Sequence, residues 1–170
     1  MSLEGYDVLV EEFKYLLEVQ KPQVAQEKLV AAALGDRSEN ADYQAAKEKL
    51  RFIDKRLFYL NSMIQKAQVI DPSTYKHQRV GFGSSVKLLD VDADIEDVYT
   101  LCGVLESEPE NHLISIHSPL ARAMLGKSVE DEFKIKLPKG QKEYEILEIW
   151  YENIFSLKKN IRTKKDFAFH

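Results

Sequence analysis

The sequence holds one cysteine, one tryptophan and four histidines among 170 residues. A single cysteine, Cys102, excludes an internal disulfide and is typical of a protein from a reducing compartment. The scattered histidines lack the spacing of zinc ligands. No apolar run approaches the roughly 18 residues of a membrane span, and no secretory signal pattern opens the chain. We therefore expect a soluble, cytoplasmic protein without a membrane partner.

The net charge of -4 argues against a protein that coats nucleic acid generally. The charge is sorted along the chain, however. Residues 1–42 hold nine acids and four bases, whereas residues 43–67 hold six bases and two acids. Acids again outnumber bases in residues 79–150, by fourteen to eight. This segregation indicates a positioned basic face rather than a diffuse attraction.

Two stretches with helical periodicity flank residues 35–43. In the second, apolar residues recur in alternating steps of four and three, the mark of a coiled-coil seam: Ala46, Leu50, Ile53, Leu57, Leu60, Ile64 and Ala67. The first carries a broader stripe: Leu9, Val10, Phe13, Leu16, Leu17, Val24 and Leu29. Lys21-Pro22 predicts a kink or break there, and Gly35 a left-handed helix cap. The short connection predicts an antiparallel hairpin over 1–75, with its tip at 35–43.

After residue 75 the pattern changes to short stretches of β-branched and aromatic residues separated by turns, over residues 79–150. In "EFKIKL" apolar and polar residues alternate, as in a half-buried strand. "SPLARAMLGK" predicts one short helix, with Ser118 as its cap and Pro119 at its first position. The predicted class is α+β: a helical hairpin, a small sheet domain, and a basic tail at 151–170 that begins as a helix.

Four segments together resemble the bacterial GreA/GreB transcript cleavage factors: "GDRSENADYQAAK" at the tip, "AQVID" after the second arm, then "FGSSVKLL" and "LISIHSPLARAMLGK". The resemblance runs from about Gly5 to Trp150 and implies that the sheet domain is FKBP-like. It further implies an elongation factor whose sheet domain docks at the rim of the RNA polymerase secondary channel. The hairpin would then help the polymerase to cut the 3′ end of backtracked nascent RNA. Such a factor is not itself an enzyme, and we expect a monomer.

The resemblance assigns chemistry to the acidic tip. Asp36 and Glu39 match the family's metal-binding carboxylates, which would share a second Mg²⁺ ion with the polymerase active site. Asp42, one helical turn further, would tune the local charge. The structural alternative is a capping box, with Asp36 at the cap and Glu39 three residues later. Spacing alone favours the cap, and the family motif favours metal binding.

Two further groups are candidate contact sites. A basic patch predicted to contact RNA or polymerase comprises Arg37, Lys47, Lys49, Arg51, Lys55 and Arg56. Phe52, Phe58 and Tyr59 fall outside the seam beside this patch, where they could stack on bases or pack on the other arm. The predicted docking segment at the polymerase rim is His117, Ser118, Pro119 and Leu120. The structural alternative is that this segment only starts a helix over the sheet.

Three other functions remain open. A related channel-blocking inhibitor would share the fold, although the Asp36/Glu39 pair favours cleavage stimulation. A coiled-coil chaperone or prolyl isomerase would need an aromatic-lined pocket in the sheet domain, and residues 79–150 supply few aromatics. A structural spacer would leave the tip motif unexplained.

Overall fold

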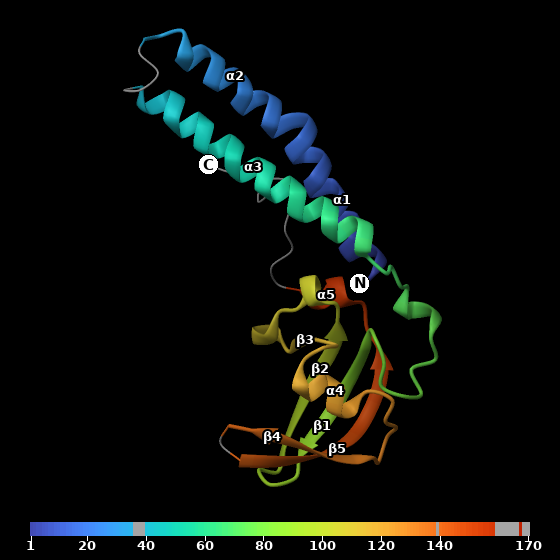
Figure 1. Ribbon diagram of the computed structural model, residues 1–170. Helices are drawn as coiled ribbons and strands as arrows, with labels where there is room; N and C mark the ends of the chain where they lie inside the picture. Colours follow the sequence, from blue (N-terminus) through green and yellow to red (C-terminus); the bar gives the residue numbers. More distant parts are fainter. Residues whose placement is uncertain (36–39, 139, 159–166, 168–170) are drawn as a thin grey trace. The chain divides into compact units, whose positions relative to one another are not determined.

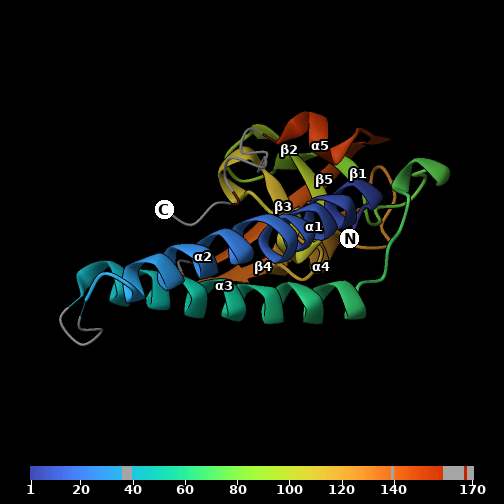
Figure 2. The same ribbon diagram turned by 90° about the horizontal axis from the view of Figure 1, so that it is seen from above.

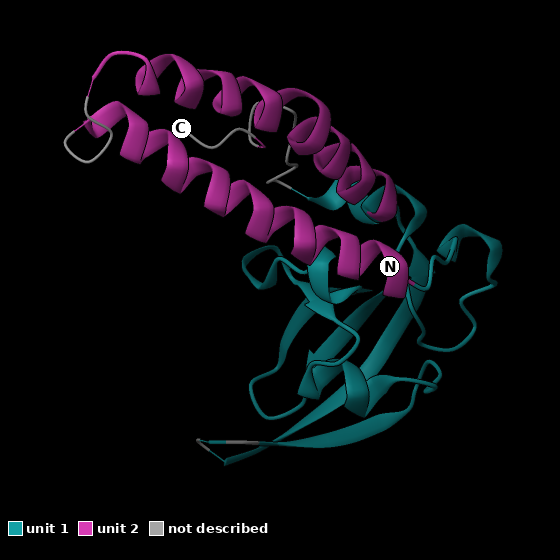
Figure 3. Cartoon of the chain, turned by 45° about the horizontal axis from the view of Figure 1, so that its top comes forward, with its two compact units in different colours: residues 1–5, 68–161 teal, residues 6–67, 162–170 magenta. Residues whose placement is uncertain are grey.

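The computed structural model describes residues 1–35, 40–138, 140–158 and 167 (Figure 1). The chain forms two compact units (Figure 3). The globular unit comprises residues 1–5 and 68–161, and the hairpin unit comprises residues 6–67 and 162–170. Among the described residues, no helix is long and apolar enough to cross a membrane.

Two helical arms form the hairpin unit and lie side by side in both views of the ribbon (Figures 1 and 2). The elements are α1 (Leu3–Tyr15), the π-helical turn η1 (Leu16–Gln20), α2 (Lys21–Ala32) and α3 (Ala41–Lys66). The predicted antiparallel hairpin is therefore confirmed. Its buried apolar residues are Leu9, Leu16, Val24, Ala31, Ala46, Ile53, Leu57 and Leu60.

The first arm buries a narrower strip than its sequence predicts. Leu17 and Leu29 are 42% and 66% exposed, so their assignment to the buried stripe is wrong. A two-helix contact covers only a thin seam on each helix, and both residues fall beside that seam. Polar residues occupy seam positions instead: Glu12 and Gln20 are buried.

The predicted disturbance near Lys21-Pro22 is confirmed as the π-helical turn η1. The Lys21 N–H donates to the carbonyl of Leu16, five residues back rather than four. Pro22 has no N–H to give to the carbonyl of Glu18, and its ring crowds that carbonyl. Widening the preceding turn relieves the crowding and lets the arm continue as α2.

The globular unit is built on a five-stranded sheet in the order β3-β2-β1-β5-β4. All neighbouring strands are antiparallel except β2 and β3, which are parallel. The predicted series of short strands is confirmed, and the "EFKIKL" strand is β4. Their bounds are β1 (Ser84–Asp90), β2 (Ile95–Cys102), β3 (Leu113–Ser115), β4 (Glu132–Leu137) and β5 (Gly140–Tyr151).

The short helix α4 (Pro119–Met124) packs on the sheet and completes the core. The Ser118 hydroxyl accepts a hydrogen bond from the Ala121 N–H at 3.2 Å, which confirms the predicted cap. Ala121 and Met124 are fully buried against apolar residues of the sheet. Three 3₁₀ turns complete the connections: η2 (Pro72–Thr74), η3 (Val104–Glu106) and η4 (Pro109–Asn111).

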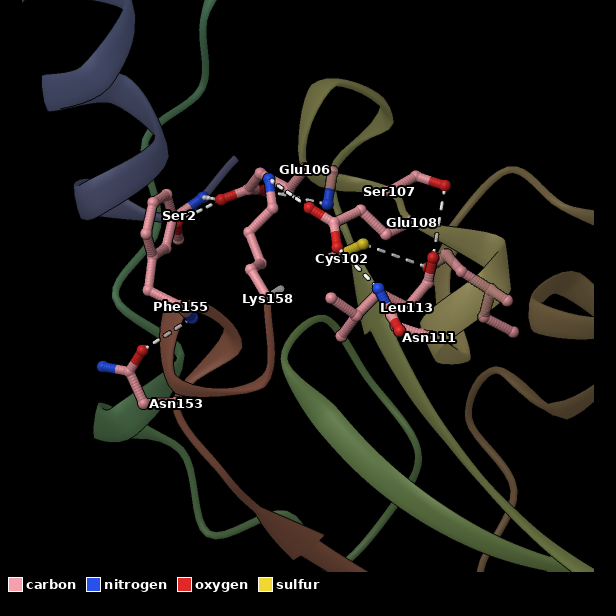
Figure 4. A network of polar contacts seen from close by, with 12 residues as sticks. Ser2, Cys102, Glu106, Ser107, Glu108, Asn111, Leu113, Asn153, Phe155 and Lys158 are labelled. Atoms are coloured by element: carbon pink, nitrogen blue, oxygen red, sulfur yellow. Dashed lines mark hydrogen bonds and ion pairs between the residues drawn. The ribbon is translucent and has the colours of Figure 1, made fainter. Parts of the chain in front are cut away.

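The predicted helical start of the tail is confirmed as α5 (Ile154–Leu157). Ile154 is buried with Cys102 and Leu113 in a small apolar cluster of the globular unit. The Asn153 side chain accepts a hydrogen bond from the Phe155 N–H at 2.8 Å and so caps α5 (Figure 4). Lys158, which follows α5, forms an ion pair with Glu108 at 3.6 Å. The start of the tail is therefore part of the globular unit.

A buried carboxylate fastens the first residues of the chain to the globular unit. Glu106 is 2% exposed and accepts hydrogen bonds from the N–H groups of Ser2 and Gly103, each at 2.9 Å (Figure 4). It also accepts from the Ser2 hydroxyl, which in turn accepts from the Gly5 N–H and caps α1. A side chain at Gly5 or Gly103 would press on this carboxylate, so a substitution at either position would have to displace Glu106 from its hydrogen bonds.

Cys102 gives a pH test of this packing. Burial, reinforced by the negative charge of Glu106, raises the pKa of its thiol to about 12. The unfolded thiol loses its proton at a lower pH, so this residue leaves stability unchanged below about pH 8.5 and lowers it as the pH rises further. We expect wild type to lose up to about 1.4 kcal/mol per pH unit more than Cys102→Ala above that pH.

The measurement is urea unfolding of both proteins from about pH 7 to pH 10.5. Titrations common to the two proteins cancel in the difference between their slopes. Parallel pH dependences would contradict the buried, proton-retaining thiol.

Candidate functional site

The predicted tip site adjoins the turn between the hairpin arms. Asp36, Arg37 and Glu39 lie outside the described residues. The two flanks are described: α2 ends at Ala32, and α3 begins at Ala41. The structure therefore shows how the ends of the tip segment are held.

Asn40 joins both flanks through its side-chain amide. Its Oδ1 accepts a hydrogen bond from the Tyr43 N–H at 3.0 Å and caps α3. Its Nδ2 donates to the carbonyl of Ala31, in the last turn of α2, at 2.7 Å. The alternative that Asp36 caps this helix is wrong, because Asn40 holds that position. Asparagine is among the preferred N-cap residues, so the sequence contained the signal.

The predicted glycine cap is also wrong, since α2 stops before Gly35. The N–H groups of Ala33 and Leu34 bond to carbonyls three residues back, each at 3.1 Å. This tightened turn satisfies the carbonyls of Val30 and Ala31 while Ala33 keeps a right-handed conformation. Gly35 follows the turn with φ of 152°.

Asp42 is the described member of the predicted carboxylate set. It is exposed in the first turn of α3, where a negative charge is favoured by the helix dipole. Within the described ranges, no group of three or more His, Cys, Asp or Glu side chains could hold a metal ion. A metal site at the tip would thus depend on Asp36 and Glu39.

The described part of the predicted basic patch lies along α3. Lys47, Arg51 and Lys55 are exposed, in keeping with one outer stripe at four-residue spacing. Lys49 is half-buried. Arg51 pairs with Glu48 at 2.7 Å on the surface.

Three aromatic side chains on α3 face solvent, as their positions outside the seam predict. Phe52, Phe58 and Tyr59 are 48%, 80% and 39% exposed. Arg51 lies over the ring of Phe52, 5.8 Å from its centroid, in cation–π contact. Phe58 is the most exposed aromatic of this group and offers a ring face for stacking.

The predicted docking segment divides into two kinds of residue. Ser118 caps α4, and Leu120 packs against the core of the globular unit. His117 and Pro119 are exposed. Ser118 and Pro119 therefore start the helix, whereas His117 and Pro119 are exposed and accessible to a partner.

Comparison with known proteins identifies the family. The domain described as "Transcription elongation factor, N-terminal" matches residues 1–69, and "Transcription elongation factor, GreA/GreB, C-term" matches residues 75–151. The chain belongs to the GreA/GreB family. It is 49% identical over 154 residues to transcription elongation factor GreA of Helicobacter hepaticus, covering 91% of this chain and 94% of that protein. It is also 49% identical over 154 residues to transcription elongation factor GreA of a Nitratiruptor species, again covering 91% of this chain and 94% of that protein.

Among solved structures, the GreA/GreB factor of Nitrosomonas europaea is 26% identical. That comparison covers 56% of this chain and 79% of that chain, with a TM-score of 0.41.

This GreA/GreB-family chain continues past the matched region, which ends at residue 151. Beyond that point, Ile154 and Phe167 are each 2% exposed. Within the hairpin unit, the Phe167 ring lies 6.3 Å from that of Tyr15, centroid to centroid. The extension therefore contributes buried apolar residues as well as charge.

Arg56 has a role inside the hairpin of this GreA/GreB-family chain that its sequence position did not reveal. Its guanidinium donates to both oxygens of Glu12, at 2.7 and 2.9 Å, across the two arms. The Glu12 side chain is 2% exposed and that of Arg56 is 27% exposed. The hydrogen bond to Glu12 is the main reason that the pKa of Arg56 is raised. Removing Arg56 should be strongly destabilising, because the buried Glu12 carboxylate would lose this ion pair.

We expect Arg56→Met to lower the free energy of unfolding of the hairpin by roughly 3 kcal/mol, because Glu12 would lose its bidentate partner. Methionine retains an apolar stem of similar length, so the change isolates the charge. The measurement is urea unfolding followed by far-ultraviolet circular dichroism, which reports mainly on the helices.

Arg51→Met is the matched control, since it removes a surface pair on the same helix and should cost less than about 0.5 kcal/mol. If both variants lose the same free energy of unfolding, the Glu12–Arg56 pair stabilises the hairpin no more than a surface ion pair does.

Proposed function

We propose that this chain binds RNA polymerase through the secondary channel and stimulates the polymerase's own cleavage of backtracked RNA. Membership of the GreA/GreB family supports a role in transcript elongation. The observation that carries the cleavage role is the position of Asp36 and Glu39. They lie in the segment between the end of α2 and the start of α3, whose two ends Asn40 joins.

A magnesium ion suits the chemistry of this donor set. Carboxylate oxygens are the ligands that Mg²⁺ prefers, and the ion usually keeps several waters and takes only one or two carboxylates from one protein. Asp36 would hold the ion together with polymerase groups, and Glu39 would share that role and orient the attacking water. When bound, the ion neutralises phosphate charge and acidifies a bound water. Asp42 would add negative charge beside them from the first turn of α3.

On this account the chain is an activator rather than an enzyme. Asp36 and Glu39 offer too few ligands to hold a metal tightly on their own. The reaction would take place in the polymerase active centre, and the chain would act as a cytoplasmic monomer. His117 and Pro119 would meet the channel rim from the globular unit.

The basic stripe on α3 would contact the RNA 3′ segment. Lys47, Arg51 and Lys55 present positive charge at regular spacing, which suits a phosphate backbone. Phe58 adds an exposed ring on which a base could stack. Arg56 is not needed for this contact, because its guanidinium bonds to Glu12.

The cavity described in the globular unit does not favour the isomerase alternative. A cavity of about 330 Å³ in the globular unit has no Phe, Tyr or Trp in its lining. Its lining residues are Val98, Thr100, Glu110, Asn111, His112, Glu152 and Leu157. A site for an apolar proline ring is usually lined by hydrophobic and aromatic side chains.

The central prediction concerns the two tip carboxylates. Asp36→Ala and Glu39→Ala should each slow the stimulated cleavage of backtracked RNA by at least ~100-fold, about 2.7 kcal/mol of barrier. Both should still bind the cognate polymerase, because the globular unit is unchanged. Single-turnover cleavage and equilibrium binding measure the two quantities separately.

Glu11→Ala is the control, since it removes an exposed acid of the first arm away from the tip. If wild type binds polymerase but leaves cleavage at the intrinsic rate, the chain is a channel-blocking inhibitor. If wild type does not bind polymerase, the proposed function is wrong.

A further inference from the structure

We propose that Asn40 is a positioning residue for the tip. Its amide would hold together the two described flanks of the tip segment that carries Asp36 and Glu39, the last turn of α2 and the start of α3. This inference rests on the proposed function, since it concerns the same carboxylates. It adds a residue that neither binds metal nor contacts RNA in the account given above.

The two contacts of Asn40 have different consequences. The Oδ1 contact with the Tyr43 N–H, at 3.0 Å, caps α3 and is local to one arm. The Nδ2 contact with the Ala31 carbonyl, at 2.7 Å, spans nine positions in sequence and joins the other arm. The first contact starts a helix, and the second closes the turn.

The environment fixes which way the amide points. Tyr43 offers a backbone donor and Ala31 a backbone acceptor, so the reversed amide would oppose like groups on both sides. The Ala31 carbonyl also accepts from the Leu34 N–H at 3.1 Å. The Ala31 carbonyl therefore accepts two hydrogen bonds, one from Leu34 after α2 and one from Asn40 before α3.

Common cap residues cannot make both contacts. Aspartate can cap α3, but its carboxylate has no donor for Ala31 and would repel that carbonyl. Serine can also cap, but its hydroxyl is shorter than an amide by one bond and cannot span the same gap. Either replacement would therefore keep the helix start and release the turn.

Release of the turn should lower the maximal cleavage rate rather than polymerase affinity. The polymerase-binding surfaces of the globular unit and the α3 stripe are unchanged, whereas the flanks of the segment that carries the tip carboxylates would no longer be joined. Because catalysis needs near-attack geometry, small losses of position are costly in rate. We expect a fall of about tenfold, or about 1.4 kcal/mol.

The experiment compares wild type with Asn40→Asp and Asn40→Ser in cleavage of backtracked RNA over a range of factor concentrations. Both variants should show about tenfold lower rates at saturation. Their half-saturating concentrations should stay within about twofold of wild type. Circular dichroism should show unchanged helix content, since each variant can cap α3. Gln26→Glu, an exposed amide-to-acid change on α2, controls for added negative charge and should behave as wild type.

Each other result overturns the inference in a distinct way. Wild-type rates in both variants would show that the Ala31 contact does not position the tip. A loss in Asn40→Asp alone would assign the effect to charge, and a loss in Asn40→Ser alone would assign it to capping. A wild-type protein that binds without stimulating cleavage would instead remove the proposed function itself, and the inference with it.

Discussion

The packing of the two arms along one narrow apolar seam is the constraint on which the hairpin depends. Leu16, Ile53 and Leu60 are fully buried in that seam. A two-helix contact buries too little surface to tolerate much misalignment, so polar contacts at defined points help to set the register. Glu12 and Arg56 do so between α1 and α3, and Asn40 does so at the tip.

These polar contacts sort the charges of the hairpin into two roles. The Glu12–Arg56 pair is largely shielded from water, so each charge depends on the other for its stabilisation. Lys47 and Lys55 remain exposed on α3 and available to an anionic partner. The predominantly basic stretch of residues 43–67 therefore contains a structural cation, Arg56, beside a solvent-facing basic stripe.

The globular unit is also held together by a few largely buried polar contacts. Glu106 ties the residues before α1 to the turn after β2, and Lys158 ties the end of α5 to Glu108. The extension beyond the family match is thus partly integrated into the unit. Its buried residues, Ile154 and Phe167, explain why it carries large apolar side chains among its bases.

Local patterns were sufficient to predict most elements. Period-two alternation identified β4, and the Ser118-Pro119 pair identified the start of α4, because both signals depend on neighbours in sequence. The errors involve choices that depend on the other arm. Leu17 and Leu29 are helical and apolar but lie beside the seam. The sequence does not distinguish Arg56 from its basic neighbours, because its partner Glu12 lies on the other arm. Asp36 and Glu39 have capping-box spacing, yet Asn40 holds the cap, and their metal-binding role remains a prediction.

The most direct test of the account is the magnesium dependence of cleavage. If the tip carboxylates help to hold the second ion, wild-type factor should lower the Mg²⁺ concentration that gives half-maximal cleavage by the polymerase. Asp36→Ala should bind the polymerase and leave that concentration at the value for polymerase alone. A wild-type factor that raises the maximal rate without changing the half-maximal Mg²⁺ concentration would contradict metal donation by the tip.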